Sequence, residues 1–404
     1  MVFDGDGSEM DWTVGYDPPA ETFQATLQKM LTGTETYKSL AAAYAKNPKD
    51  AATVFKLAQK WADRYNDVNA SKLYKEIVAL DPDGKMGTTE YQKEQVSYTE
   101  LAEFNIGTSA VRGRPPVPGP LLAFIKKYSK GKIVQDAYGG LAAWYFSRTA
   151  PKDEAFKFFD EYTGRYPQDF MALSAYTRRI ILDGENLDKG LQIAQKAVAV
   201  AQGPSKSMAL QSLARVHLLR GDKPKAAETA EEILKLGPGQ GMMMMTMAMP
   251  AGAAAAGPPP GTAQGETVAI TMGSSAADMS ALTAALIFVQ AERMDRALAV
   301  FGPEYLKKNL DKAQAVSSYA SFWSGQNANL ESALEAARKA TELNPSAYNV
   351  WTSLSQINLK LKKYDDALKA AEKALELAPA QPAQIKDNIK KSIDQIKAAA
   401  LEKK

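Results

Sequence analysis

The chain has 404 residues, of which 45% are hydrophobic, and 49 basic residues nearly balance 46 acidic ones to give a formal net charge of +3. This balance offers no electrostatic basis for a nucleic-acid partner. The chain has no cysteine, which excludes thiol catalysis, disulfides, zinc–thiolate sites and iron–sulfur clusters. It contains no run of 18 apolar residues, so we expect no membrane insertion.

Residues 1–31 predict a strand, a tight turn, a second strand and a helix. Val2 and Phe3 favour a strand, and Asp4-Gly5-Asp6-Gly7 is typical of a hairpin turn. Glu9 to Tyr16 alternates as a second strand would, before Asp17-Pro18-Pro19 breaks it. In Glu21 to Leu31, four apolar residues share one helical face: Phe23, Leu27, Met30 and Leu31.

This order, with Val14-Gly15-Tyr16, resembles the closing segment of a thioredoxin fold. The resemblance implies a final hairpin and a helix packed on its sheet. In that family the redox Cys-x-x-Cys and the cis-proline would both lie before Met1, and no residue here matches them. The chain is then a piece of a longer thioredoxin–repeat protein, or its start is placed too late, or the segment is only a cap. An ordinary hairpin without that ancestry stays open.

The first ten residues are acidic and lack an apolar core, so they predict no signal peptide in this chain. The localisation is unknown. A soluble, cysteine-free composition is compatible with the bacterial periplasm or the extracellular space.

One spacing then recurs along the chain: a small residue is followed by a proline twelve positions later. The five instances are Ala70 to Pro82, Ala155 to Pro167, Ala226 to Pro238, Ala333 to Pro345 and Ala367 to Pro379. Pro345 and Pro379 lie 34 residues apart. A fixed period of this length indicates stacked helix-turn-helix units.

The fullest copy runs from Asp50 to Pro82. Its first helix places four residues at i, i+3, i+4 and i+7: Val54, Leu57, Ala58 and Trp61. Its second helix has Ala70, Tyr74 and Ile77 on one face. Two helices approach to about 8–10 Å only where their side chains are small, so we expect Ala58 to meet Ala70. Ala143, Ala214 and Ser355 hold the equivalent small position in other copies.

These residues resemble the tetratricopeptide repeat, W-x2-L-G-x2-Y, then A-x3-F, then P. The resemblance covers most of residues 35–381 and implies an all-α, right-handed α-solenoid of about eight helix hairpins. Residues 171–202 and 281–303 are diverged copies, and residues 88–130 are the poorest, with a long helix and a proline-rich loop. An irregular helical bundle is the alternative.

We divide the chain accordingly into five segments. They are residues 1–31 (thioredoxin-like hairpin and helix), 32–239 (repeats), 240–275 (an insertion rich in Met, Gly, Ala and Pro), 276–381 (repeats) and 382–404 (a capping helix).

The insertion begins with Met242-Met243-Met244-Met245 and continues through Ala253 to Ala256 into three prolines. Thioether sulfurs suit Cu(I), but such sites usually include a nearby His or Cys, and the only histidine is His217. We therefore predict no metal. Met242 to Met249 and Glu266 to Met272 are expected to pair as an apolar hairpin, so residues 241–274 could mediate self-association.

No arrangement of residues indicates catalysis or a cofactor. His217 occupies the packed position that Trp61 and Phe146 hold in other copies, and a lone core histidine makes no Ser-His-Asp set. Asp4 to Gly7 lacks the glutamate that a calcium loop requires. We predict no catalytic residue, no cofactor and no metal ligand.

The repeat resemblance instead implies a groove formed by the first helix of each hairpin. By register, seven residues are candidates to line it: Phe55, Gln59, Tyr138, Trp144, Asn349, Thr352 and Gln356. The set is apolar and amide-rich, which suits an extended or helical segment of a protein. The predicted function is a non-catalytic protein–protein interaction scaffold. One alternative is the repeat tail of a thioredoxin-family oxidoreductase whose catalytic head is missing from this chain. The other is a subunit of a homomeric assembly that uses the Met-rich arm.

Overall fold

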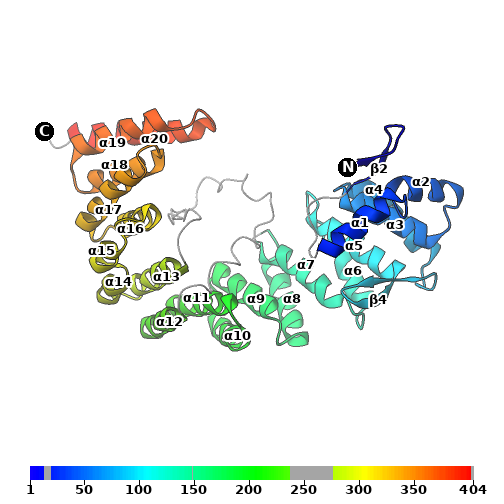
Figure 1. Ribbon diagram of the computed structural model, residues 1–404. Helices are drawn as coiled ribbons and strands as arrows, with labels where there is room; N and C mark the ends of the chain where they lie inside the picture. The colour runs from blue at the N-terminus through cyan, green and yellow to red at the C-terminus, as the bar shows by residue number, and fades with distance from the viewer. Residues whose placement is uncertain (13–19, 148, 237–275, 402–404) are drawn as a thin grey trace. The chain divides into compact units, whose positions relative to one another are not determined.

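The computed structural model describes residues 1–12, 20–147, 149–236 and 276–401. The chain divides into two compact units, Met1–Tyr176 (unit 1) and Thr177–Lys404 (unit 2), and the division falls inside one helix (Figure 1). The described elements are almost all helical, as predicted.

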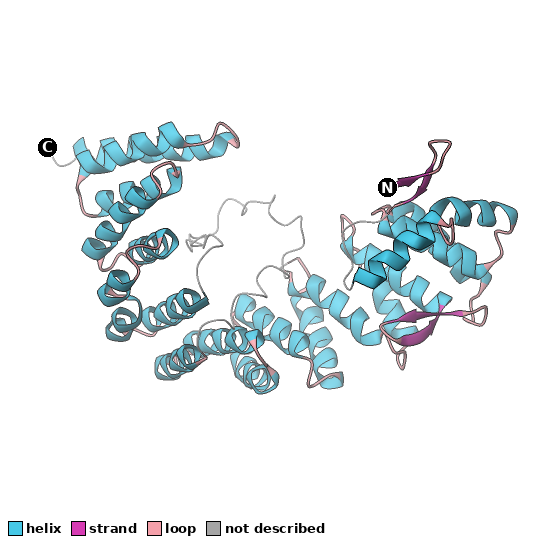
Figure 2. Cartoon of the chain, in the orientation of Figure 1, coloured by secondary structure: helices cyan, strands magenta, loops and turns pink. Residues whose placement is uncertain are grey.

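Unit 1 combines helices with two antiparallel strand pairs, drawn in magenta in Figure 2. Its strands are β1 (Val2–Phe3), β2 (Glu9–Asp11), β3 (Thr88–Tyr91) and β4 (Glu94–Ser97). Its helices are α1 (Ala20–Leu31), α2 (Tyr37–Lys46), α3 (Ala51–Asp63), α4 (Asp67–Leu80), α5 (Tyr98–Arg112), α6 (Gly119–Lys127), α7 (Val134–Phe146) and α8 (Lys152–Arg165). Helix α9 (Phe170–Asp183) carries the division.

Unit 2 is built from helices that pack as successive hairpins. They are α10 (Leu187–Val200), α11 (Pro204–Leu219), α12 (Lys223–Lys235), α13 (Ala276–Gln290), α14 (Met294–Phe301), α15 (Pro303–Lys308), α16 (Ala313–Gly325), α17 (Leu330–Leu343), α18 (Tyr348–Lys360), α19 (Tyr364–Leu377) and α20 (Ala383–Leu401). The predicted diverged copies at residues 171–202 and 281–303 correspond to α9–α10 and α13–α14. The Met-rich insertion and its expected hairpin lie outside the described residues.

The helices end where the recurring prolines predict. Helix α4 stops at Leu80, and Asp81, just before Pro82, leaves the helical conformation. Helix α19 stops at Leu377, and Ala378 is extended before Pro379. A residue that precedes proline is disfavoured in the helical region, so the local sequence alone sets these ends.

The small residues at the predicted helix crossings are buried in three of the four copies, those with Ala58, Ala214 and Ser355. Ala58 and Ala70 are both buried between α3 and α4. In the last copy the crossing is tied by a hydrogen bond, because the Ser355 hydroxyl of α18 donates to the carbonyl of Ala367 in α19 at 2.8 Å. The predicted register of these hairpins is therefore confirmed.

The predicted register is wrong in α7. Ala143 was expected at the crossing with α8, but it is exposed, and Ala142 is the buried alanine. The rotation follows from aromatic packing: Tyr145 stacks on Phe158 of α8 with the ring centroids 4.5 Å apart. A large ring gains more from burial than a methyl group does, so it decides which face turns inward.

The predicted order of strand, turn, strand and helix is present at the N-terminus, although β2 is short and residues 13–19 lie outside the described part. Ion pairs hold this hairpin against the first helices. Lys38 of α2 lies 2.8 Å from Asp4, and Arg64 lies 2.7 Å from Glu9. The Asp11 carboxylate is buried beside Arg64.

Residues 88–130 contain the long helix and the proline-rich loop that we predicted, as α5 and residues 113–118, and also a strand pair that we did not predict. A hairpin, β3–β4, precedes α5, and the loop leads into α6. The β3–β4 turn pairs Tyr91 with Glu94 and leaves Gln92 and Lys93 as a two-residue loop, both at positive φ. Such turns strongly favour Asn and Gly, and neither occurs here, so the sequence carried no turn signal.

The C-terminal helix is present as α20. Ile389, Ile393 and Ile396 lie on its buried face and join one core cluster with the alanines of α19. This face covers the apolar side of the last hairpin, which is what a capping helix does in a helical stack.

Candidate partner-binding surfaces

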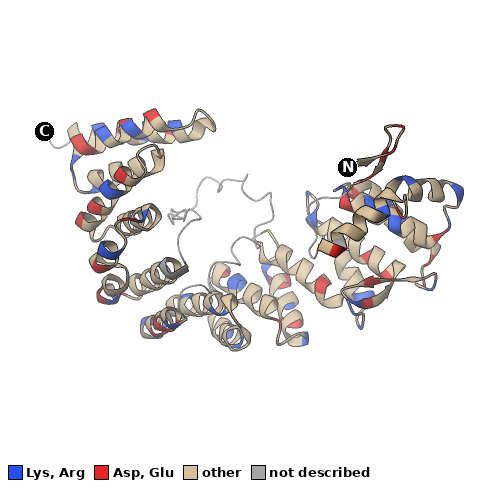
Figure 3. Cartoon of the chain, viewed as in Figure 1, with Lys and Arg blue, Asp and Glu red and all other residues tan. Residues whose placement is uncertain are grey.

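Two kinds of helix alternate in the C-terminal part of unit 2. Helix α16 contains no charged residue and α18 contains only Lys360. The helices that follow each of them, α17 and α19, are rich in Glu, Lys and Asp. The contrast can be followed in Figure 3. Charged faces favour water, whereas uncharged polar faces can be covered at a much smaller desolvation cost. The free faces of α16 and α18 are therefore the candidate surface in unit 2.

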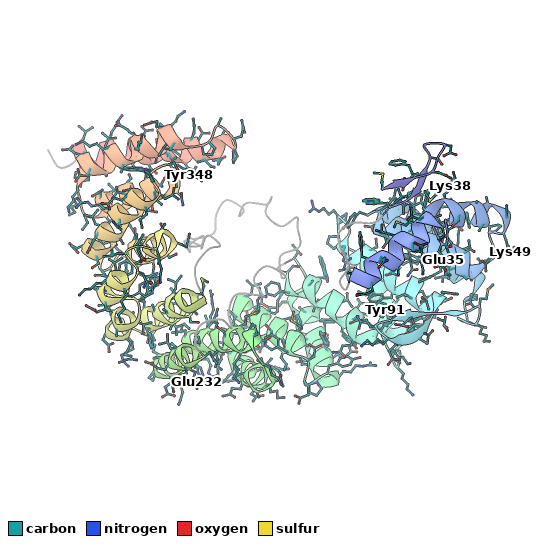
Figure 4. All side chains as sticks on the ribbon, viewed as in Figure 1. Glu35, Lys38, Lys49, Tyr91, Glu232 and Tyr348 are labelled. Atoms are coloured by element: carbon teal, nitrogen blue, oxygen red, sulfur yellow. The ribbon has the colours of Figure 1, made fainter. Side chains whose placement is uncertain are left out.

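The three predicted groove residues of α18 lie on this surface. Asn349, Thr352 and Gln356 follow each other at i, i+3 and i+7, so they share one face. Asn349 and Gln356 are exposed and Thr352 is half-buried. The Thr352 hydroxyl donates to the carbonyl of Tyr348, labelled in Figure 4, at 3.0 Å. The side-chain amides of Asn349 and Gln356 make no hydrogen bond within the described part of the chain.

The neighbouring helix α16 extends the polar surface. Helix α16 contacts α18 directly. On its partly exposed side, Ser317 and Ser321 have no hydrogen-bond partner among the residues that the structure describes. We did not predict these two serines.

The two predicted groove residues of α3, Phe55 and Gln59, differ in burial. Phe55 is fully buried, with its ring 5.0 Å from that of Tyr98, so its assignment to an accessible groove is corrected. Gln59 is exposed and lines a cavity of about 550 Å³ in unit 1. Phe55 and Gln59 are one turn apart on α3, yet the phenyl ring is buried and the amide is exposed. The reason is that burying an aromatic ring in the helix–helix contact lowers the free energy of the folded state.

The cavity in unit 1 lies where α1 faces α3 and α5. Its walls combine the buried side chains of Met30, Leu40 and Leu101 with the polar groups of Gln59 and Asn105. Glu35 and Tyr91, labelled in Figure 4, also line it. Lys56 donates a hydrogen bond to Glu35 and thereby lowers the pKa of that carboxyl group. Sequence reasoning missed Tyr91 because the β3–β4 hairpin was not predicted, and it missed Asn105 because the long helix of residues 88–130 was given no repeat register.

The two predicted groove residues of α7, Tyr138 and Trp144, also differ in burial. Tyr138 is buried and stacks on Tyr162 at 5.0 Å, so its assignment to an accessible groove is corrected as well. Burial, together with the hydrogen bond that its hydroxyl donates to Glu161, raises the pKa of Tyr138 to about 12. Trp144 is half-buried, so part of its indole ring remains accessible.

Within the described ranges, neither a metal site nor a membrane-spanning helix is found. No group of three or more His, Asp or Glu there could hold a metal ion. Among the helices that the structure describes, none combines the length and the apolar character needed to span a bilayer.

Comparisons with known proteins agree with the repeat pattern. The family model described as "Tetratricopeptide repeat" matches residues 182–241 and 325–382. No curated protein matches the sequence. The helical repeat fold of the chain is that of tetratricopeptide-type solenoids, whereas none of these matches supports the thioredoxin resemblance of residues 1–31.

Among solved structures, a tetratricopeptide repeat protein from Parabacteroides merdae is 11% identical with a TM-score of 0.38, over 86% of this chain and 98% of its own. YrrB, described as a TPR protein with an unusual peptide-binding site, is 14% identical with a TM-score of 0.29, over 58% of this chain and 97% of its own. At similarities this low, neither structure bears on what this chain binds. The family matches cover α10–α12 and α17–α19, and the chain therefore contains tetratricopeptide repeats.

Proposed function

We propose that the chain is a non-catalytic protein–protein interaction scaffold, and that the uncharged faces of α16 and α18 receive an extended or helical segment of a partner protein. The observation that carries this proposal is the pair of unpartnered amides, Asn349 and Gln356, on an exposed face of a helix that is otherwise nearly free of charge. Primary amides both donate and accept hydrogen bonds, so they can satisfy the backbone of a bound peptide.

Energetics favour this face over the charged helices. A partner that covered α17 or α19 would have to desolvate carboxylates and ammonium groups, whose burial costs much more than that of hydroxyls and amides. The serines of α16 are small, so they leave room for the backbone of a partner to approach closely. Gln59 at the cavity in unit 1 and Trp144 on α7 remain candidates for further contacts.

A peptide selection with a matched control tests the proposal. Peptides from a random phage-displayed library are selected on the full chain, and their affinity is measured by calorimetry. The double variant Asn349→Ala with Gln356→Ala should bind them at least about tenfold more weakly, because each lost hydrogen bond to a desolvated partner is worth about 1 kcal/mol. The control variant, Asn388→Ala with Gln395→Ala, removes two exposed amides from α20 and should bind normally.

The proposal fails if the two double variants bind the selected peptides equally well, or if no peptide is enriched on the chain. Circular dichroism of both variants should match the parent, since all four amides are exposed.

The two alternative functions stay predictions. The oxidoreductase alternative needs a catalytic head that this chain does not contain, and it has no support from the comparisons. Self-association through residues 241–274 falls outside the described residues. Deleting those residues and measuring the mass by light scattering would test it.

A further inference from the structure

A second surface, in unit 1, is distinguished by charge. Between Glu103 and Asp136 the chain has six basic residues and no Asp or Glu. The six are Arg112, Arg114, Lys126, Lys127, Lys130 and Lys132, and all are exposed. They lie at the end of α5, in the loop before α6, and at the end of α6 and just beyond it. This group is called the basic patch here.

Most of the basic patch is not neutralised by neighbouring carboxylates. Lys127 lies 2.6 Å from Glu103, and Lys132 is paired with Glu94. Arg112, Arg114, Lys126 and Lys130 form no ion pair within the described part of the chain. Cations at helix C-termini stabilise the helix dipole, which gives Arg112 and Lys126 a structural role. Arg114 and Lys130 lie outside the helices, so that role does not account for them.

The helix hairpin beneath the basic patch, α5–α6, is closely packed. A methyl group at Gly107 of α5 would come within 2.9 Å of the Leu121 Cα of α6, so the two helices touch at that glycine. Phe124 is buried, with its ring 5.7 Å from that of Phe104. The Val117 amide donates to the Ala110 carbonyl at 2.9 Å and anchors the loop. The backbone positions that carry the cations are therefore fixed by packing before any partner arrives, so the backbone of this surface need not be ordered on binding.

The two ends of α6 carry separate groups of free cations. Gly107 lies opposite Leu121 and Glu103 opposite Lys127, so α5 and α6 are antiparallel. Arg112 and Arg114 consequently lie near the start of α6, and Lys126 and Lys130 lie near its end. The nine residues of α6 span about 13 Å at 1.5 Å per residue. An extended chain covers that distance with roughly four or five residues.

We infer that the basic patch binds a short acidic segment of a partner protein, laid along α6 with carboxylates about 13 Å apart. Val117 and Leu122 lie between the two cation groups and are 49% and 38% exposed. They offer apolar contact to the middle of such a segment. This surface lies in unit 1 and is independent of the proposed peptide face on α16 and α18.

The orientation of α6 argues against a lipid surface as the partner. A helix that lies in a membrane interface points its apolar side at the lipid. Helix α6 instead buries that side, with Leu121, Phe124 and Ile125, in the protein. In addition, acidic residues outnumber basic ones in residues 1–176 as a whole. A short segment interacts only with charges within about 8 Å at physiological salt, so it can bind the patch without contacting the carboxylates elsewhere in unit 1.

The test measures the binding of a fluorescein-labelled decaglutamate peptide to the full chain by anisotropy, with decaglutamine as the neutral probe. We expect decaglutamate to bind, decaglutamine not to bind, and the affinity for decaglutamate to fall as salt rises from 50 to 200 mM. The variant Arg112→Ala, Arg114→Ala, Lys126→Ala and Lys130→Ala should bind decaglutamate at least about tenfold more weakly.

A control variant removes the same charge from unit 2: Lys369→Ala, Lys390→Ala, Lys391→Ala and Lys397→Ala, all exposed lysines. It should retain the parent affinity. Equal losses in both variants would mean that only net charge matters and would overturn the inference. It is also overturned if vesicles of phosphatidylcholine and phosphatidylserine, or duplex DNA, bind the patch more tightly than decaglutamate does.

Discussion

The helix pairs α7–α8 and α18–α19 have the same architecture but opposite packing chemistry. In α18–α19 the contact is made by small residues, with Ser355 against Ala367 and further buried alanines at Ala371 and Ala374. In α7–α8 it is made by rings, with Tyr138 against Tyr162 and Tyr145 against Phe158. The same helix-turn-helix unit can therefore be packed either by small residues that allow close backbone contact or by large interlocking rings. The difference predicts that the first pair is sensitive to added volume and the second to removed volume.

The largest expected effect is the loss of a buried ring from α8, the second helix of the aromatic pair, at its contact with α9. Phe159 is fully buried and stacks on Tyr176 at 5.3 Å. Phe159→Ala should lower the free energy of unfolding by about 3–5 kcal/mol, because the cavity cannot be refilled by rigid neighbours. Phe156→Ala in the same helix is the control, since Phe156 is half-buried, and it should cost clearly less. Urea denaturation with hydrogen exchange in α7 and α8 measures both, and equal losses would contradict the assignment.

Substitutions that add side-chain volume should destabilise α18–α19 more than α7–α8. Ala367→Leu forces a large side chain into the α18–α19 crossing and should cost about 1–3 kcal/mol. Ala143→Leu, in the aromatic pair, should change the stability little because Ala143 is exposed. The melting temperatures of the two variants test this directly. If Ala143→Leu were the more damaging, the observed rotation of α7 would be wrong.

A smaller effect isolates the hydrogen bond at the alanine-type crossing. Ser355→Ala removes the donor to the Ala367 carbonyl and should cost about 1 kcal/mol. Ser353→Ala is the matched control, since that hydroxyl donates to Asn349 within its own helix and is not enclosed by α19. A stability loss in Ser353→Ala equal to that in Ser355→Ala would show that the bond between helices contributes nothing specific.

The smallest expected effect is a pH dependence in α11, where the packed position is filled by the only histidine. His217 is buried, and burial lowers its pKa despite the Asp222 carboxylate 3.7 Å from Nδ1. The unfolded chain therefore binds the proton more readily, and stability should fall as the pH drops from about 6.5 towards the lower folded pKa. NMR titration of this single imidazole gives the folded pKa directly. His217→Gln should remove that part of the pH dependence, and an unchanged pH profile would contradict the prediction.

Helix ends and repeat spacing could be predicted from the sequence because their causes are local. A proline restricts the residue before it whatever surrounds it, and this is why α4 and α19 stop where the pattern indicates. The small residues at positions 58 and 355 could be found for a related reason, since close crossings accept few residue types.

Which face of a helix turns inward was decided by the tertiary structure. Phe55 and Tyr138 were placed on a groove by register, but their rings lie in the core because burying an aromatic side chain outweighs a consensus spacing. The β3–β4 hairpin is a further case, since Gln92 and Lys93 adopt positive φ without the usual turn residues. Its stability comes from contacts such as Tyr91 against Phe104 at 5.9 Å. The six cations around α6 were visible in the sequence, but only the antiparallel contact of α5 and α6 brought them together at the ends of one helix. Local chemistry sets where elements begin and end, whereas the orientation of each face depends on residues far away in the chain.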